Sequence, residues 1–240
     1  MEHLVHCITN YVAMNFTANA LLAVGTRPVM SFCPEEMDEL VSKCCALMIN
    51  IGCLDKQLIE ASEKAVIAAK KYNKPWVLDP VGVGLTQLRT ETCKRLILLN
   101  PPAIIRGNKA EITTLGNIDA ECVVVTSGAT DLITKTITKT KTHPFDQLKT
   151  GEARGRIITK TVTSGHPIMA DVTAMGCVAS ALCAAMLAKG EQPIDAAYHA
   201  MLAMGECGER AAAKCFGTGS FNQIFIDELY NLTLTTDSDF

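Results

Sequence analysis

Short, nearly continuous apolar runs and longer stretches of helical pattern alternate along the first half of this chain. The apolar runs have the length of strands that are buried on both faces, as in a parallel sheet covered by helices. These predicted strands span residues 4–8, 29–32, 46–51, 76–78, 103–105 and 122–125. Helical patterns lie between them, at residues 12–24, 35–45, 57–71, 91–98 and 110–115.

This alternation predicts an α/β fold with a doubly wound, mostly parallel central sheet and helices on both of its faces. The crossovers between parallel strands are expected to be right-handed. In such folds ligands bind where the carboxyl ends of the strands meet the loops that follow them. Functional residues are therefore expected at that edge of the sheet.

The pattern changes after Asp131. Residues 134–161 are rich in Thr and Lys and predict an exposed β-hairpin with a long tip around residues 141–156. The basic residues of the tip could meet a nucleotide, but a solvated loop is the favoured interpretation. Three further helices are predicted, and the polar, acidic residues from 233 to 240 are expected to fray. These helices span residues 177–189, 195–215 and 221–229.

Length and composition narrow the class of protein. The chain has 240 residues, enough for one sizeable α/β domain, and a single domain over residues 1–240 is the expectation. The 22 basic and 25 acidic residues nearly balance, which argues against a nucleic-acid or membrane-surface protein. Eleven cysteines without a regular framework predict reduced thiols in a cytoplasmic protein.

The segment of residues 165–177 is the most informative part of the sequence. It runs from a Gly/Pro turn through small residues into an alanine-rich apolar helix. A loop of this kind points backbone N–H groups and the positive end of the helix dipole at one spot, which favours an anion. Cys177 falls in the first turn, where the dipole is expected to lower the pKa of a thiol. The combination suggests phosphate chemistry.

Polar residues also follow several of the predicted strands. Asp79 could hold Mg²⁺ or be a turn residue before Pro80, and Arg106 opens a Gly-containing loop. Glu111 stands three residues after Asn108, which is also the spacing of a helix capping box. Ser127 offers a hydroxyl for phosphate or ribose, yet a plain turn fits as well. Each signal is weak alone, but all fall at the same edge of one predicted sheet.

Short motifs that cover residues 5–230 occur in a family-specific order. They are His6-Cys7-Ile8-Thr9-Asn10, Pro28-Val29-Met30, Asn50-Ile51-Gly52, Asp79-Pro80-Val81-Gly82, Arg106-Gly107-Asn108 with Glu111, Ser127-Gly128, Gly165-His166-Pro167 and Gly176-Cys177. In this combination the chain resembles the hydroxyethylthiazole kinases, a branch of the ribokinase-like superfamily.

The resemblance implies an activity and a set of roles. The family phosphorylates the primary alcohol of 4-methyl-5-(2-hydroxyethyl)thiazole with ATP and Mg²⁺, a thiamine salvage step, and is a homotrimer with sites between subunits. By resemblance, Cys177 lies beside the acceptor hydroxyl as the catalytic residue. The remaining implied roles are ATP binding by Arg106 and Ser127, thiazole binding by Met30, Ala174 and Asn10, an anion hole at Met175 and Gly176, and metal binding by Asp79 and Glu111.

The chain departs from the family at Ala174 and Met175, where the family usually has glycine followed by a small residue. If residue 174 needs a positive φ, alanine there costs about 1 kcal/mol. Two alternatives to the thiazole kinase therefore stay open on the sequence. One is a kinase of another small alcohol, such as hydroxymethylpyrimidine. The other is a catalytically weak member of the family that binds the ligand.

Overall fold

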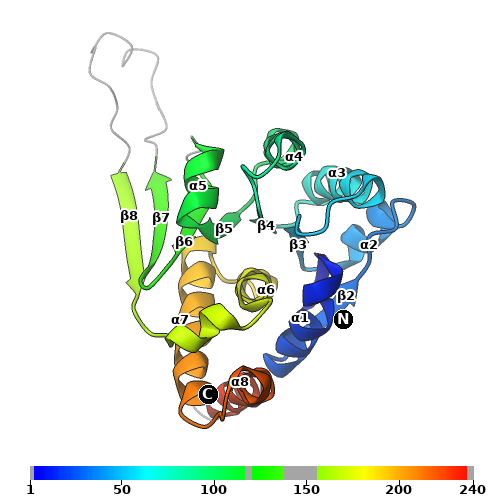
Figure 1. Cartoon of the computed structure of the whole chain (residues 1–240). Coiled ribbons are helices and arrows are strands. Elements are labelled where there is room, and N and C mark those ends of the chain that lie inside the picture. The colour runs from blue at the N-terminus through cyan, green and yellow to red at the C-terminus, as the bar shows by residue number, and fades with distance from the viewer. Residues whose placement is uncertain (1–2, 117–120, 138–155, 237–240) are drawn as a thin grey trace.

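A computed structural model describes residues 3–116, 121–137 and 156–236 of the chain, with the side chains given up to residue 232 (Figure 1). Within these ranges the strands form one eight-stranded sheet in the order β2-β1-β3-β4-β5-β6-β7-β8. The strands from β2 to β6 run parallel, and β7 and β8 are added antiparallel at one edge. The strands are β1 (Leu4–Ile8), β2 (Arg27–Met30), β3 (Ala46–Asn50), β4 (Trp76–Asp79), β5 (Ile104–Asn108), β6 (Val123–Ser127), β7 (Asp131–Ile137) and β8 (Arg156–Val162).

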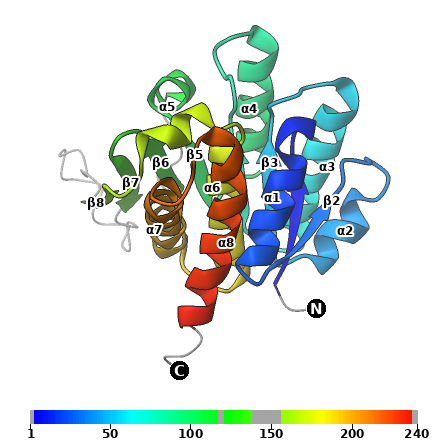
Figure 2. The same ribbon diagram turned by 60° about the horizontal axis from the view of Figure 1, so that its bottom comes forward.

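Helices cover both faces of the sheet. One face carries α1 (Tyr11–Ala23), α6 (Met175–Ala188), α7 (Pro193–Ala212) and α8 (Thr218–Thr236). The other carries α2 (Met37–Lys43), α3 (Lys56–Lys71), α4 (Gln87–Leu99) and α5 (Lys109–Leu115). Figure 2 shows α8 between α7 and α1, and both of these helices contact it. A short 3-10 helix, η2 (Pro167–Asp171), leads into α6. The predicted doubly wound fold is confirmed.

The strand side chains alternate between two hydrophobic cores. Val5 and Met48 belong to the core beneath α1, α6, α7 and α8, whereas Leu47 and Ile49 belong to the core beneath α2, α3 and α4. All residues of β1, β3 and β4 are buried. This double burial is the reason why the strands appear as continuous apolar runs rather than as alternating ones.

The structure corrects several predicted boundaries. Strands β5 and β6 extend to Asn108 and Ser127, so the polar residues at those positions belong to the strand ends rather than to the loops. Helix α8 continues to Thr236, so the expectation of fraying was wrong for residues 233–236. The hairpin is confirmed by β7 and β8, and most of its predicted tip lies outside the described residues.

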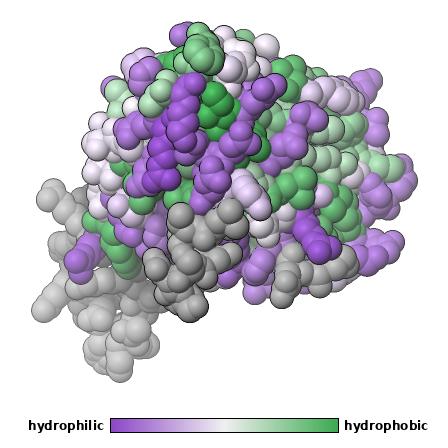
Figure 3. Space-filling model, turned by 90° about the horizontal axis from the view of Figure 1, so that it is seen from below, coloured by the Kyte–Doolittle hydropathy of each residue, from purple (hydrophilic) through white to green (hydrophobic). Residues whose placement is uncertain are grey.

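One face of the molecule is mixed in hydropathy (Figure 3). Figure 3 shows hydrophilic and hydrophobic residues interspersed over one face of the molecule. None of the helices in the described ranges combines the length and the hydropathy needed to span a membrane.

Candidate active site at the carboxyl ends of the strands

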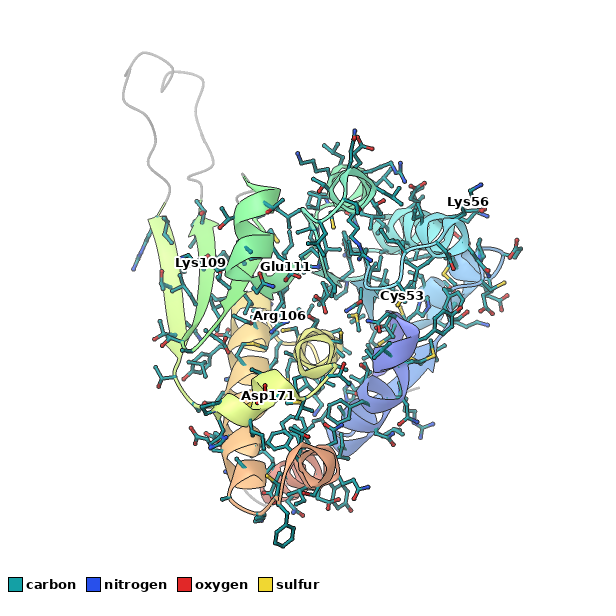
Figure 4. All side chains as sticks on the ribbon, in the orientation of Figure 1. Cys53, Lys56, Arg106, Lys109, Glu111 and Asp171 are labelled. Carbon is teal, nitrogen blue, oxygen red and sulfur yellow. The ribbon has the colours of Figure 1, made fainter. Side chains whose placement is uncertain are left out.

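A cavity of about 980 Å³ opens at the carboxyl ends of β4, β5 and β6, beside the start of α6. Its walls include Asp79, Arg106, Ser127 and Cys177, which come from four different elements. Figure 4 shows Arg106 and Glu111 between the ribbons of α5 and α6. The predicted location of the site at this edge of the sheet thus coincides with a cavity.

Strand alternation directs the polar strand ends toward α6. Ile104 and Val125 lie in the core beneath α6, and two residues further along their strands come Arg106 and Ser127. Because side chains two residues apart share a face of a strand, these two polar groups point to the side of α6. The same period places Asp79, two residues after Val77, on this side.

The start of α6 is a backbone anion site without a side-chain cap. Ala174 is the N-cap residue in the left-handed region, with φ of 67°, and no side chain caps the helix. The N–H groups of the first turn have no partner within their own helix, so those of Met175, Gly176 and Cys177 are available to a ligand. The backbone at residue 174 does adopt a positive φ, and alanine holds it at a cost of about 1 kcal/mol.

Arg106 packs directly against this helix start. A Cβ atom on Gly176 would lie 2.6 Å from Nη1 of Arg106, so only glycine lets the guanidinium approach so closely. Arg106 makes no ion pair with a described residue, and its buried Nε has no hydrogen-bond partner. A cation without an anionic partner, next to a helix N-terminus, is suited to a phosphate group.

Cys177 lies on the cavity wall at the first turn of α6. Its Sγ accepts hydrogen bonds from Nδ2 of Asn50 at 3.1 Å and from Nδ2 of Asn10 at 3.6 Å. Burial, and next the nearby Asp79 carboxylate, raise the pKa of the thiol to about 11. The expected lowering of this pKa was therefore wrong, because the desolvation of the sulfur outweighs the electrostatic effect of the helix start.

Asp79 lines the cavity, and one of its two carboxylate oxygens lacks a hydrogen bond. Its Oδ2 accepts a hydrogen bond of 2.7 Å from Asn50, whereas Oδ1 is buried and makes no hydrogen bond of ordinary geometry with a described residue, although the Ser180 hydroxyl is near enough to the carboxyl to favour its charged form. Burial raises the pKa of this carboxyl to about 6, against the opposing effect of Arg106. An unsatisfied carboxylate oxygen of this kind fits Mg²⁺, which usually binds few protein groups and keeps several waters.

Glu111 is bound on both oxygens by backbone groups. Its Oε1 accepts from the N–H of Gly82 at 2.9 Å, and its Oε2 accepts from the N–H of Asn108 at 2.9 Å. The second contact completes a capping box at the start of α5. The capping interpretation is thereby confirmed. In the described residues no group of three or more His, Cys, Asp or Glu gathers at one point, so any metal site here rests on few carboxylates.

The far end of the cavity carries a hydroxyl and a second carboxylate. Oγ of Ser127 is buried near the carboxyl of Asp131 and makes no hydrogen bond of ordinary geometry with a described residue. Asp131 accepts a hydrogen bond of 3.1 Å from the N–H of Gly128, and burial raises the pKa of its carboxyl. Both residues line the cavity together with Arg106. A polar ligand group can therefore be bound at the end of β6.

Two of the candidate substrate-binding residues do not line the cavity. Met30 ends β2 at the edge of the sheet and packs against the core beneath α6. Asn10 caps α1 through the N–H of Ala13 and contacts Cys177 from behind the cavity wall. Ala174, the third candidate, does line the cavity. For Met30 and Asn10 the role in binding stays a prediction.

Sequence reasoning missed two further residues. Asn50 joins Asp79 to Cys177; the sequence showed it as a polar residue in an apolar strand and as part of the Asn50-Ile51-Gly52 motif, but it was given no role. Arg89 on α4 donates three hydrogen bonds of 2.7–2.9 Å, to the carbonyls of Ile51, Gly52 and Val81. It ties together the loops that follow β3 and β4. Nothing in the local pattern of α4 indicates that function.

Comparisons with known proteins point to one family. The model of the hydroxyethylthiazole kinase family matches residues 1–235 of the chain. A hydroxyethylthiazole kinase from Brachyspira hyodysenteriae is 42% identical over 236 residues, which cover 96% of this chain and 89% of the relative. A solved hydroxyethylthiazole kinase structure from Pyrococcus horikoshii OT3 superposes with a TM-score of 0.82 at 32% identity and covers 96% of this chain and 88% of the other. A ribokinase-like superfamily protein from Enterococcus faecalis shares only the fold, with a TM-score of 0.67 at 13% identity over 97% of this chain and 87% of the other.

Proposed function

The chain belongs to the hydroxyethylthiazole kinase family, and from this premise we propose that it transfers the γ-phosphoryl group of ATP to the primary alcohol of 4-methyl-5-(2-hydroxyethyl)thiazole. The protein is a kinase, and ATP is the co-substrate that its family implies. The observation that carries the proposal is one cavity that joins an uncapped helix start, an arginine without an ion pair and a cysteine. The pyrimidine and weak-binding alternatives are not favoured by the comparisons.

In this proposal the transferred phosphoryl group lies at the start of α6. The N–H groups of Met175, Gly176 and Cys177 point toward one spot, and the guanidinium of Arg106 packs against it. In the transition state charge is spread over the oxygens of the transferred group and develops on the leaving oxygen of ADP, so fixed donors at this position accelerate the reaction. Ser127, at the other side of Arg106, binds the nucleotide through its unpartnered hydroxyl.

The metal site that the family implies fits the residues present. Asp79 would hold Mg²⁺ through its unpartnered Oδ1, directly or through water. When bound, the ion neutralises charge on the ATP phosphates. Glu111 supports the site indirectly, because its oxygens hold the N–H groups of Gly82 and Asn108 and so fix the loop after β4.

Cys177 orients the acceptor hydroxyl. Its pKa of about 11 keeps the group a neutral thiol near pH 7, so a role as a preformed base is not supported. The alcohol oxygen bonds to the γ-phosphorus, the bond from that phosphorus to the bridging oxygen of ADP breaks, and the hydroxyl proton passes late to an oxygen of the transferred phosphoryl group. A loose transition state needs little proton removal at the start of this sequence.

The proposal extends to assembly and compartment. We propose a homotrimer in the cytoplasm, with residues 1–240 as one domain. Tyr11 and Val12 are 63% and 66% exposed, and the ring of Tyr11 packs against Phe32 just beyond β2. A neighbouring subunit that covers this apolar surface would bring Met30 into a shared site. All eleven cysteines lie in described ranges and none is in a disulfide, which suits a reducing compartment.

The experiment is an assay of ADP release coupled to NADH oxidation, with the thiazole alcohol and hydroxymethylpyrimidine tested side by side. The proposal expects turnover with ATP and the thiazole alcohol that depends on Mg²⁺ and is faster than with the pyrimidine. A faster reaction with the pyrimidine would identify the pyrimidine alcohol, rather than the thiazole alcohol, as the substrate. Binding of both ligands by calorimetry without any turnover would establish the weak-binding alternative instead.

A further inference from the structure

Asn50 lies at the end of β3, fully buried, directly opposite Asp79 in the register of the sheet. All hydrogen-bonding positions of its side-chain amide are occupied. Nδ2 donates to Oδ2 of Asp79 at 2.7 Å and to Sγ of Cys177 at 3.1 Å. Oδ1 accepts from Nδ2 of Asn10 at 2.9 Å and from the N–H of Gly52 at 2.9 Å. Because an amide offers two donors and two acceptor lone pairs, the group is completely satisfied.

This set of partners locks the orientation of the amide. A flipped amide would direct its oxygen at the Asp79 carboxylate and at the sulfur, and its NH₂ group at two N–H donors. Four contacts would then be lost or become repulsive, and each unsatisfied buried group costs about 1–3 kcal/mol. Asn50 therefore has one stable orientation, in which both of its protons point toward the site.

The sulfur of Cys177 receives its two N–H donors on the side away from the cavity. Asn50 and Asn10 do not line the cavity, whereas Cys177 does. With its lone pairs engaged by these amides, the thiol directs its own proton and its exposed surface toward the cavity. Asn50 thus has no access to a substrate in the cavity and acts on it only through other residues.

The surroundings leave the amides no room to move. A Cβ atom on Gly52 would lie 2.7 Å from Nδ2 of Asn10 and 2.9 Å from Oδ1 of Asn50. The carbonyl of Gly52 is in turn held by Arg89 at 2.9 Å. Close packing at Gly52 therefore restricts the movement of both amides, and Cys177 is the member of the network that lines the cavity.

We propose that Asn50 is a positioning residue that holds the Cys177 thiol and the Asp79 carboxylate at a constant separation, so that the acceptor hydroxyl and the phosphates are presented together. The proposal rests on the kinase function given above. It assigns to Asn50 the alignment of two groups that lie 98 positions apart in the sequence, at residues 79 and 177.

The test is a double-mutant cycle with Asn50→Ala, Cys177→Ala and the combined variant. Asn50→Ala is expected to lower kcat about 10- to 100-fold, while KM for ATP changes less than about 3-fold. In the Cys177→Ala background the same replacement is expected to lower kcat by a clearly smaller factor than in the wild type, because one of the two groups that Asn50 positions is gone and only Asp79 remains. Additive losses in the cycle would overturn the proposal.

If Asn50→Ala does not fold, Gly52→Ala provides a second test of the positioning role. This variant removes no polar group but pushes on both amides, and it is expected to lower kcat about 3- to 10-fold with an unchanged fold by circular dichroism. Full activity of a folded Gly52→Ala variant would contradict the proposal. Asn19→Ala is the matched control, since Asn19 is an exposed amide on α1 whose side chain, among the described residues, hydrogen-bonds to Asn15 alone, and wild-type kcat is expected.

A crystal structure of Asn50→Ala separates this proposal from the proposed function. Cys177 is expected to leave its rotamer or to occupy several, whether or not the wild-type protein phosphorylates the thiazole alcohol. An unmoved Sγ would overturn the positioning role. Absence of wild-type turnover, by contrast, would refute the proposed function. The position of the Cys177 side chain in the wild-type and Asn50→Ala crystal structures would then still test whether Asn50 positions it.

Discussion

Replacement of Gly176 by alanine is the most direct perturbation of the proposed phosphate site. The new Cβ atom would lie 2.6 Å from Nη1 of Arg106, about 0.8 Å closer than the 3.4 Å at which ordinary contacts begin. The guanidinium or the start of α6 must therefore shift by about this distance. Helix propensity does not oppose the change, because alanine is favoured over glycine in a helix.

A misplacement of about 1 Å in groups that bind the transition state can cost about 100-fold in rate. We therefore expect Gly176→Ala to lower kcat/KM for ATP about 10- to 100-fold, equivalent to about 1.4–2.7 kcal/mol of transition-state stabilisation. Thermal stability is expected to stay close to wild type, because the guanidinium stands at the end of the flexible Arg106 side chain and can move away from the new Cβ atom. The assay is coupled ADP release at varied ATP, with circular dichroism melts of the same preparations.

Gly219→Ala is the matched control for this variant. Gly219 also lies in the first turn of a helix, α8, but nothing lies within 4 Å of its added Cβ atom. Wild-type kinetics are expected. If Gly176→Ala keeps kcat/KM within about threefold of wild type, the contact between Arg106 and the helix start does not contribute to catalysis, and the reasoning is refuted.

Four further predictions address other parts of the molecule. Cys177→Ala should lower kcat with little change in the binding of ATP by calorimetry, whereas Cys177→Asp should retain turnover; unchanged kcat in Cys177→Ala would exclude a role for the thiol. Ala174→Gly should raise the free energy of unfolding by about 1 kcal/mol in urea titrations, because it relieves the positive φ; a loss of stability would contradict this. Burial raises the pKa of Asp79 from 3.8 to about 6, so the folded state binds this proton more tightly than the unfolded state does. In EDTA the free energy of unfolding should therefore fall as the pH rises from about 4 to 6, by on the order of 3 kcal/mol. Urea titrations at several pH values should show this slope reduced in Asp79→Asn. Light scattering should give a trimer at micromolar concentration, and a stable monomer would refute the proposed assembly.

The sequence predicted the elements of the fold well because burial on both faces leaves a strong local signal. The runs that became β1, β3 and β4 were recognised from their apolar residues alone. The ends of β5 and β6 were predicted too early, because Arg106 and Ser127 are polar although they continue the strands. Their polarity reflects the cavity beside them rather than the end of the strand.

The candidate site was predicted in part. The sequence indicated Asp79, Arg106 and Ser127 as polar residues after apolar runs and Cys177 as a reactive residue at a helix start. The structure gathers all four around one cavity. The pKa of Cys177 was predicted in the wrong direction, because a helix start is visible in a sequence but the burial of its sulfur is not.

What the sequence determined by itself is local: the periodicity of strands and helices, the capping box at Asn108 and the order of motifs that marks the family. What only the tertiary structure decided is the meeting of distant groups. Asn50 reaches Cys177 across 127 positions, and Arg106 lies against Gly176, because parallel strands and their crossover helices bring their ends to one edge of the sheet. Hydrogen bonds and desolvation depend on such neighbours in space, and a linear pattern records neighbours only along the chain.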